Sequence, residues 1–138
     1  MTNETIKDLV LEAKKENLDK VMSFIETCLE NTSCSAKAMM QINLAVEEIY
    51  INVASYAYGA GSGDVTVKVE ADPHIVSITF IDSGIPYDPL KKPDPDVTLS
   101  AEERSIGGLG IFLTKKFMDD VIYEYKDGKN ILTLKKQF

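Results

Sequence analysis

The stretch Asp64–Gly84, DVTVKVEADPHIVSITFIDSG, decides the fold of this 138-residue chain. Apolar and polar residues alternate on both sides of the turn Asp72-Pro73-His74, and the apolar members are Val65, Val67, Val69, Val76, Ile78 and Phe80. Alternation of this kind is typical of half-buried strands. The stretch therefore predicts a β-hairpin whose second strand leads into Asp82-Ser83-Gly84.

Working outward from the hairpin, hydrophobic spacing and turn residues give the element order β-α-α-β-β-loop-α-β-β. The remaining expected elements are strands over 6–13, 120–125 and 131–136, and helices over about 16–29, 35–58 and 107–118. Ser35 is expected to cap the long helix. Crossovers that contain helices can place strands parallel, so we expect a mixed sheet. About three helices on one face of that sheet make an α+β fold, a two-layer sandwich.

Composition narrows the class of protein. With 138 residues, 44% of them hydrophobic and 27% charged, the chain suits one globular domain over 1–138. No apolar run reaches the ~18 residues of a membrane span, and the N-terminal residues lack the features of an export signal. A cytoplasmic location without a membrane partner is expected.

Charge, cysteine spacing and histidine content argue against binding of nucleic acid and against a zinc site. The net charge of −7 repels nucleic-acid backbones, and no basic patch offsets it. Cys28 and Cys34 lack a metal-type spacing, which favours a reducing compartment. Because His74 is the only histidine, a zinc site is not expected.

A carboxylate and an amide share one face of the long helix. Glu48 and Asn52 lie four residues apart, about one helical turn. An Asn oxygen is a ligand suited to Mg²⁺, and a neighbouring carboxylate can accept a proton from water or from a substrate hydroxyl. Taken alone, the pair indicates no more than a solvated polar face. Glu47, about 100° around the helix, competes for the role of base, and Glu48 is preferred.

The hairpin ends in Asp82-Ser83-Gly84, and a Pro-rich segment follows. Asp82 at a strand end can accept a hydrogen bond from an exocyclic amino group such as that of adenine, and Gly84 permits a close approach that a side chain would block. Alone, the motif fits a plain turn better. Residues 83–106 carry four prolines and little apolar periodicity. A loop of this length in a compact domain is usually functional or disordered.

A glycine-rich stretch, Arg104 to Ile111, opens the helix expected from Gly107. Glycines at a helix start expose backbone N–H groups, which form a site for an anion such as phosphate. The stretch is neither a dinucleotide-binding fingerprint nor a P-loop, because it lacks the surrounding βαβ unit and the Gly-Lys-Ser/Thr sequence. A hinge or a tight packing point would also explain these glycines.

Together, these motifs resemble the Bergerat-fold (GHKL, histidine-kinase-like) ATPases, and among them the anti-sigma factor serine/threonine-protein kinases most closely. The resemblance rests on three stretches, which are Ala45–Asn52 with Tyr58, Asp82–Pro89, and Gly108–Leu113 continuing to Val121. It covers the chain from about residue 5 to 138. It implies a single histidine-kinase-like ATPase domain over 1–138, with an ATP lid at about 83–107.

The resemblance also implies a role for each motif residue. Glu48 would be the general base, Asn52 the Mg²⁺ ligand, and Asp82 the acceptor for the adenine amino group, with Gly84 beside it. Four residues would lie along the phosphates, namely Gly108, Leu109, Gly110 and Ile111. Arg104 and Ser105 of the lid would reach phosphate oxygens when the lid closes.

Three positions depart from the family pattern. Tyr56 stands where many relatives have His, and Thr133 is offset from a threonine that often helps bind adenine. Lys20 takes the place of an arginine that often contacts the partner, and it cannot make the same bidentate contact.

The implied function is that of an ATP- and Mg²⁺-dependent protein serine/threonine kinase. Its partners would be a STAS-domain anti-anti-sigma protein, which it phosphorylates, and a sigma factor, which it sequesters. Relatives often dimerise, which leaves a homodimer open. The alternative is a nucleotide-gated binding module without catalysis; the presence of Glu48 favours catalysis. A histidine-kinase fragment is a third option, and the lack of an upstream helical segment with a phosphoacceptor His argues against it.

Overall fold

The computed structural model describes residues 5–59, 61–91 and 108–138 of the chain. The strands in these parts are β1 (Thr5–Glu12), β2 (Asp64–Ala71), β3 (Ile75–Asp82), β4 (Asp120–Lys126) and β5 (Lys129–Gln137). The helices are α1 (Leu18–Leu29), α2 (Ala36–Tyr56) and α3 (Gly108–Phe117), with short 3-10 turns η1 (Lys15–Asn17) and η2 (Pro89–Lys91). The predicted order of elements is confirmed.

The strands form one sheet in the order β1-β2-β3-β5-β4, and every neighbouring pair is antiparallel. The mixed sheet expected from the sequence is therefore wrong. Two helices separate β1 from β2, and the second returns the chain, so the strands run in opposite directions. The α3 crossover does leave β4 running in the same direction as β3, but β5 folds back and lies between them.

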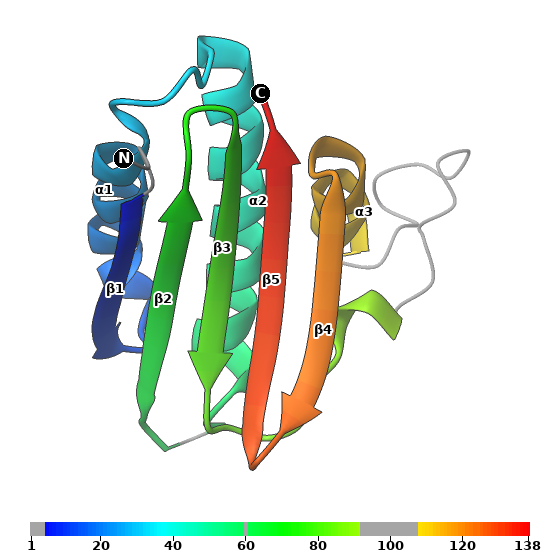
Figure 1. Ribbon diagram of the computed structural model, residues 1–138. Coiled ribbons are helices and arrows are strands. Elements are labelled where there is room, and N and C mark those ends of the chain that lie inside the picture. The colour runs from blue at the N-terminus through cyan, green and yellow to red at the C-terminus, as the bar shows by residue number, and fades with distance from the viewer. Residues whose placement is uncertain (1–4, 60, 92–107) are drawn as a thin grey trace.

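The three helices cover one face of the sheet, which confirms the α+β two-layer sandwich (Figure 1). The core lies between the layers and includes the apolar hairpin residues that alternate in the sequence. Its largest buried side chains on α2 are Ile42, Val46, Ile49 and Tyr50. The long helix begins as predicted, since the Ser35 hydroxyl accepts a hydrogen bond from Ala38 N at 3.1 Å.

A backbone hydrogen bond links the end of α2 to the segment that follows β3. Ile85 N donates to the carbonyl oxygen of Ala57 at 2.7 Å. The helix α2 also contacts the segment after β1, where the Tyr50 hydroxyl donates to Lys14 O at 2.6 Å. The first of these contacts brings the end of α2 next to the segment after β3, and the second brings α2 next to the segment after β1. In the described parts of the chain, no helix combines the length and hydropathy needed to cross a bilayer.

Candidate functional site

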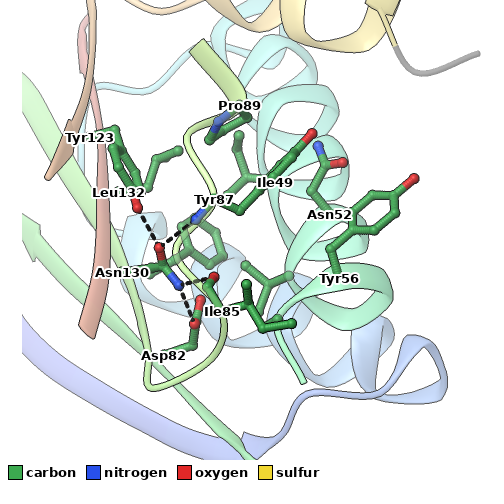
Figure 2. Close-up of a pocket in the computed structure, with 13 residues that line it drawn as sticks. Ile49, Asn52, Tyr56, Asp82, Ile85, Tyr87, Pro89, Tyr123, Asn130 and Leu132 are labelled. Atoms are coloured by element: carbon green, nitrogen blue, oxygen red, sulfur yellow. Dashed lines mark hydrogen bonds between the residues drawn. The ribbon is translucent and has the colours of Figure 1, made fainter. Parts of the chain in front are cut away.

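A pocket lies where α2, the end of β3 and the β4–β5 hairpin meet (Figure 2). Its polar lining comes from Asn52 and Tyr56 on α2, Asp82 on β3, Tyr87 after β3, and Tyr123 and Asn130 on the hairpin. The floor is apolar and includes Ile49, Phe80 and Leu132. The pocket combines an apolar slot with a few convergent polar groups, as small-molecule sites usually do.

Asp82 is the buried carboxylate of this pocket, with a residue exposure of 5%. One oxygen, Oδ1, accepts from Gly84 N and from Asn130 Nδ2, both at 2.9 Å. No described residue forms a hydrogen bond with the other oxygen, Oδ2. The carboxylate is therefore held in place by one oxygen, and the second can accept a hydrogen bond from an amino group of a ligand.

Asn130 is the residue of the site that sequence reasoning missed. It pairs with Asp82 across β3 and β5 and is 7% exposed. Its amide nitrogen donates to Asp82 Oδ1 and to Ile85 O, both at 2.9 Å, and its amide oxygen accepts from Tyr87 N at 3.0 Å and from the Tyr123 hydroxyl. All four bonds are drawn in Figure 2. The side chain ties the sheet to the segment after β3.

The protonation of Tyr123 supports this assignment of the amide. Burial raises the pKa of the Tyr123 hydroxyl, so the group stays protonated at neutral pH and donates to the Asn130 oxygen. Thr133, the other candidate on β5, faces the opposite side of the sheet, where its hydroxyl lies 3.3 Å from that of Thr79. The alternation of Asn130 with Leu132 and Leu134 was the sequence signal that could have placed Asn130 on the core face.

Two tyrosines narrow the pocket. The rings of Tyr56 and Tyr87 have centroids 5.5 Å apart and are tilted by 35°. The cavity beside them has a volume of about 30 Å³, enough for a water molecule.

The predicted pair on α2 is brought together. Asn52 Nδ2 donates to Glu48 Oε1 at 3.2 Å, and Asn52 lies on the wall of the pocket. No described residue forms a hydrogen bond with Asn52 Oδ1, so this oxygen suits a hard cation. The described residues contain no cluster of three or more His, Cys, Asp or Glu side chains that could hold a metal. A Mg²⁺ ion here would take its other ligands from phosphates and water.

The two candidate glycines with described surroundings have different neighbours. A Cβ atom on Gly84 would overlap the backbone carbonyl of Ala57 at the end of α2. A Cβ atom on Gly110 would overlap the carboxylate of Glu48. Gly84 therefore allows a backbone contact, while Gly110 makes room for the predicted base.

The remaining predicted phosphate-side residues divide into two groups. Gly108, Leu109, Gly110 and Ile111 form the first turn of α3, which is where an anion site at a helix N-terminus would be. The Ile111 side chain is 3% exposed and belongs to the core, so only its backbone could face a phosphate. Arg104, Ser105 and most of the expected lid lie outside the described residues.

The sequence matches a family model and is similar to several known proteins. The family model described as "Histidine kinase-like ATPase domain" matches residues 11–136. The serine/threonine-protein kinase BtrW of Bordetella bronchiseptica is 30% identical over 101 residues, which are 72% of this chain and 71% of BtrW. The serine-protein kinase RsbW of Listeria monocytogenes is 28% identical over 132 residues, covering 92% of this chain and 84% of RsbW.

Two further similarities extend over almost the whole chain. The anti-sigma F factor of Clostridium acetobutylicum is 23% identical over 136 residues, which are 98% of this chain and 95% of that protein. The crystal structure of the RsbU and RsbW domains of Rv1364c from Mycobacterium tuberculosis superimposes with a TM-score of 0.66 at 14% identity. The match covers 96% of this chain and 32% of that one, and it supports the fold.

Proposed function

We propose that this chain, which belongs to the histidine kinase-like ATPase domain family, is an ATP-binding protein serine/threonine kinase and anti-sigma regulatory factor. The relatives named as serine-protein kinases and anti-sigma F factors support the proposal. The observation that carries the proposal is the pocket. It contains the buried carboxylate of Asp82, of which only one oxygen is hydrogen-bonded, and it lies near the Glu48–Asn52 pair on α2.

The pocket would bind the adenine end of ATP. Asp82 Oδ2 would accept the adenine amino group, and Gly84 would keep the adjoining backbone close to α2. Asn52 would hold Mg²⁺ through its side-chain oxygen. The backbone N–H groups at the start of α3 would bind phosphate oxygens, with Arg104 and Ser105 as further phosphate contacts.

Glu48 would act as the general base. Its carboxylate packs against Gly110, beside the proposed phosphate site, where it could accept the proton of a serine or threonine hydroxyl. The hydroxyl oxygen would then form a bond to the γ-phosphorus, and ADP would leave. Bound Mg²⁺ would supply positive charge that stabilises the transferring phosphoryl group.

The proposed substrate is a STAS-domain anti-anti-sigma protein, with a sigma factor as the second partner, in the cytoplasm. A protein that gates partner binding by nucleotide without catalysis is the alternative, and a homodimer is compatible with either. The two functions differ in whether Glu48 is needed for phosphate transfer.

Incubation with radiolabelled ATP, Mg²⁺ and the STAS-domain protein encoded nearest to this chain tests the proposal. The wild type should label the partner, and Glu48→Ala should bind the partner but transfer phosphate at least ~100-fold more slowly, as expected for loss of a general base. If the wild type binds this partner but never labels it, the kinase proposal fails and the alternative of a binding module without catalysis remains.

A further inference from the structure

A second concavity lies between α2 and α3, beside Glu48. It has a volume of about 310 Å³, and its lining includes Leu44, Glu47, Glu48, Ile51, Gly110 and Leu113. We refer to it below as the α2–α3 groove. It is larger than the cavity at Asp82, and the core and the proposed adenine contacts make no use of it.

Helix geometry separates the groove from the pocket. With about 100° per residue, Leu44, Glu47 and Ile51 lie to one side of Glu48 on α2, and Ile49, Asn52 and Tyr56 lie to the other. Glu48 stands between the two stripes. A nucleotide in the pocket and a second molecule in the groove would therefore approach this carboxylate from different sides.

The groove has an apolar wall that the fold leaves exposed. Leu44 is 44% exposed, and Met40, one turn earlier on α2, is 56% exposed. Leu113 faces the groove from α3. Large apolar side chains that gather on a surface beside a polar rim are typical of protein-binding sites.

The charged side chains that line the groove are acidic. Glu47 and Glu48 both line it, and no Lys or Arg among the described residues does. Glu47 is exposed and forms no hydrogen bond or ion pair with any described residue. A basic side chain of a partner could bind this carboxylate with a charge-assisted hydrogen bond.

We propose that the α2–α3 groove receives the acceptor segment of the protein substrate, in an extended conformation, with a Lys or Arg near the phosphorylated residue. The substrate hydroxyl would meet Glu48, an apolar side chain would pack on Leu44 and Leu113, and the basic side chain would pair with Glu47. Glu47 and Glu48 are consecutive residues on α2, and an extended chain advances about 3.3 Å per residue. We therefore expect the basic residue of the acceptor within two positions of the residue that carries the hydroxyl. This inference rests on the proposed kinase function.

Charge reversal at Glu47 tests the groove. With the STAS-domain acceptor that the wild type labels, Glu47→Lys should raise the KM for the acceptor about tenfold or more, while kcat stays within about twofold. Leu44→Gln should also raise this KM. Glu124→Lys makes the same charge change on β4, at an exposed position on the sheet face away from the helices, and should leave the KM unchanged.

A compensating change in the acceptor gives a result that a structural defect could not produce. Changing the basic residues within two positions of the phosphorylated residue to Glu should restore a low KM with Glu47→Lys and raise it with the wild type. An unchanged KM in Glu47→Lys, or a fall in kcat at constant KM, overturns the groove while leaving the kinase function intact. If the wild type binds an acceptor protein but transfers no phosphate to it, both the groove proposal and the kinase function are overturned.

Discussion

At the scale of single residues, the site depends on two glycines that make room for different groups. Gly84 faces a backbone carbonyl, that of Ala57, which is fixed by the end of α2. Gly110 faces the terminal carboxylate of Glu48, which can rotate away. The same substitution should therefore harm stability at one position and chemistry at the other.

Gly84→Ala should lower the free energy of unfolding by about 2 kcal/mol, because an added methyl group would force α2 and the segment after β3 apart. Urea denaturation measures the change. Ser83→Ala, at the exposed neighbouring residue, should change stability by less than about 0.5 kcal/mol. Equal effects of the two substitutions would show that the contact with Ala57 is unimportant.

Gly110→Ala should leave the protein folded, since the clash falls on the flexible end of a side chain and alanine favours a helix over glycine by about 1 kcal/mol. Displacement of Glu48 should slow phosphate transfer about tenfold or more. Thermal unfolding and transfer assays on the same sample separate the two effects. Transfer at the wild-type rate would contradict the role of this contact.

Asn130→Ala should be among the most damaging substitutions in the pocket. It removes four hydrogen bonds and leaves Asp82, Ile85 O, Tyr87 N and the Tyr123 hydroxyl without this partner. Unsatisfied buried groups cost about 1–3 kcal/mol each, and water will satisfy some of them, so a loss of about 2–4 kcal/mol is expected in urea denaturation. Thr133→Ala on the opposite sheet face should cost about 1 kcal/mol or less.

At the scale of elements, α2 serves three surfaces. One stripe is buried in the core, a second lines the pocket with Asn52, and a third lines the α2–α3 groove with Glu47. Because Glu48 lies between the pocket and groove stripes, the rotation of the helix about its axis decides from which side each proposed ligand would meet Glu48. The start of α2 is held by its Ser35 cap, and its second half is held by Tyr50, whose hydroxyl donates to Lys14 O just after β1.

Ser35→Ala should destabilise the protein by about 1 kcal/mol, because the Ala38 N–H at the start of α2 loses its acceptor. Ser35→Asp should retain most of the stability, since Asp is also a good N-cap. Urea denaturation of the three proteins checks both expectations. If Ser35→Asp is as unstable as Ser35→Ala, the side-chain cap does not stabilise α2.

At the scale of the whole molecule, the helices cover one sheet face (Figure 1). Of these helices, α2 lines the pocket together with the β4–β5 hairpin, so a ligand there joins both layers. Binding would oppose unfolding by mass action.

ATP with Mg²⁺ at 100 times its Kd should stabilise the wild type by about 2.7 kcal/mol against unfolding. At the same concentrations, Asn52→Ala should lose most of this gain while its stability without nucleotide changes little, since Asn52 is only partly buried. Thermal unfolding with and without Mg²⁺ measures both. If Mg²⁺ increases the stability of Asn52→Ala as much as that of the wild type, Asn52 is not a ligand of the proposed metal site.

The sequence by itself determined the local features. Alternation and helical spacing predicted the α-helices and strands of the described residues, but not the two 3-10 turns. Ser35 predicted the cap, and the four-residue spacing of Glu48 and Asn52 predicted their contact, because each depends on neighbours close along the chain. Only the tertiary structure decided the direction of the strands, the bonds of Asn130 to Asp82, and the separation of pocket and groove around Glu48. These depend on contacts between residues far apart along the chain, 48 positions in the case of Asp82 and Asn130, and a period in the sequence carries no information about such pairing.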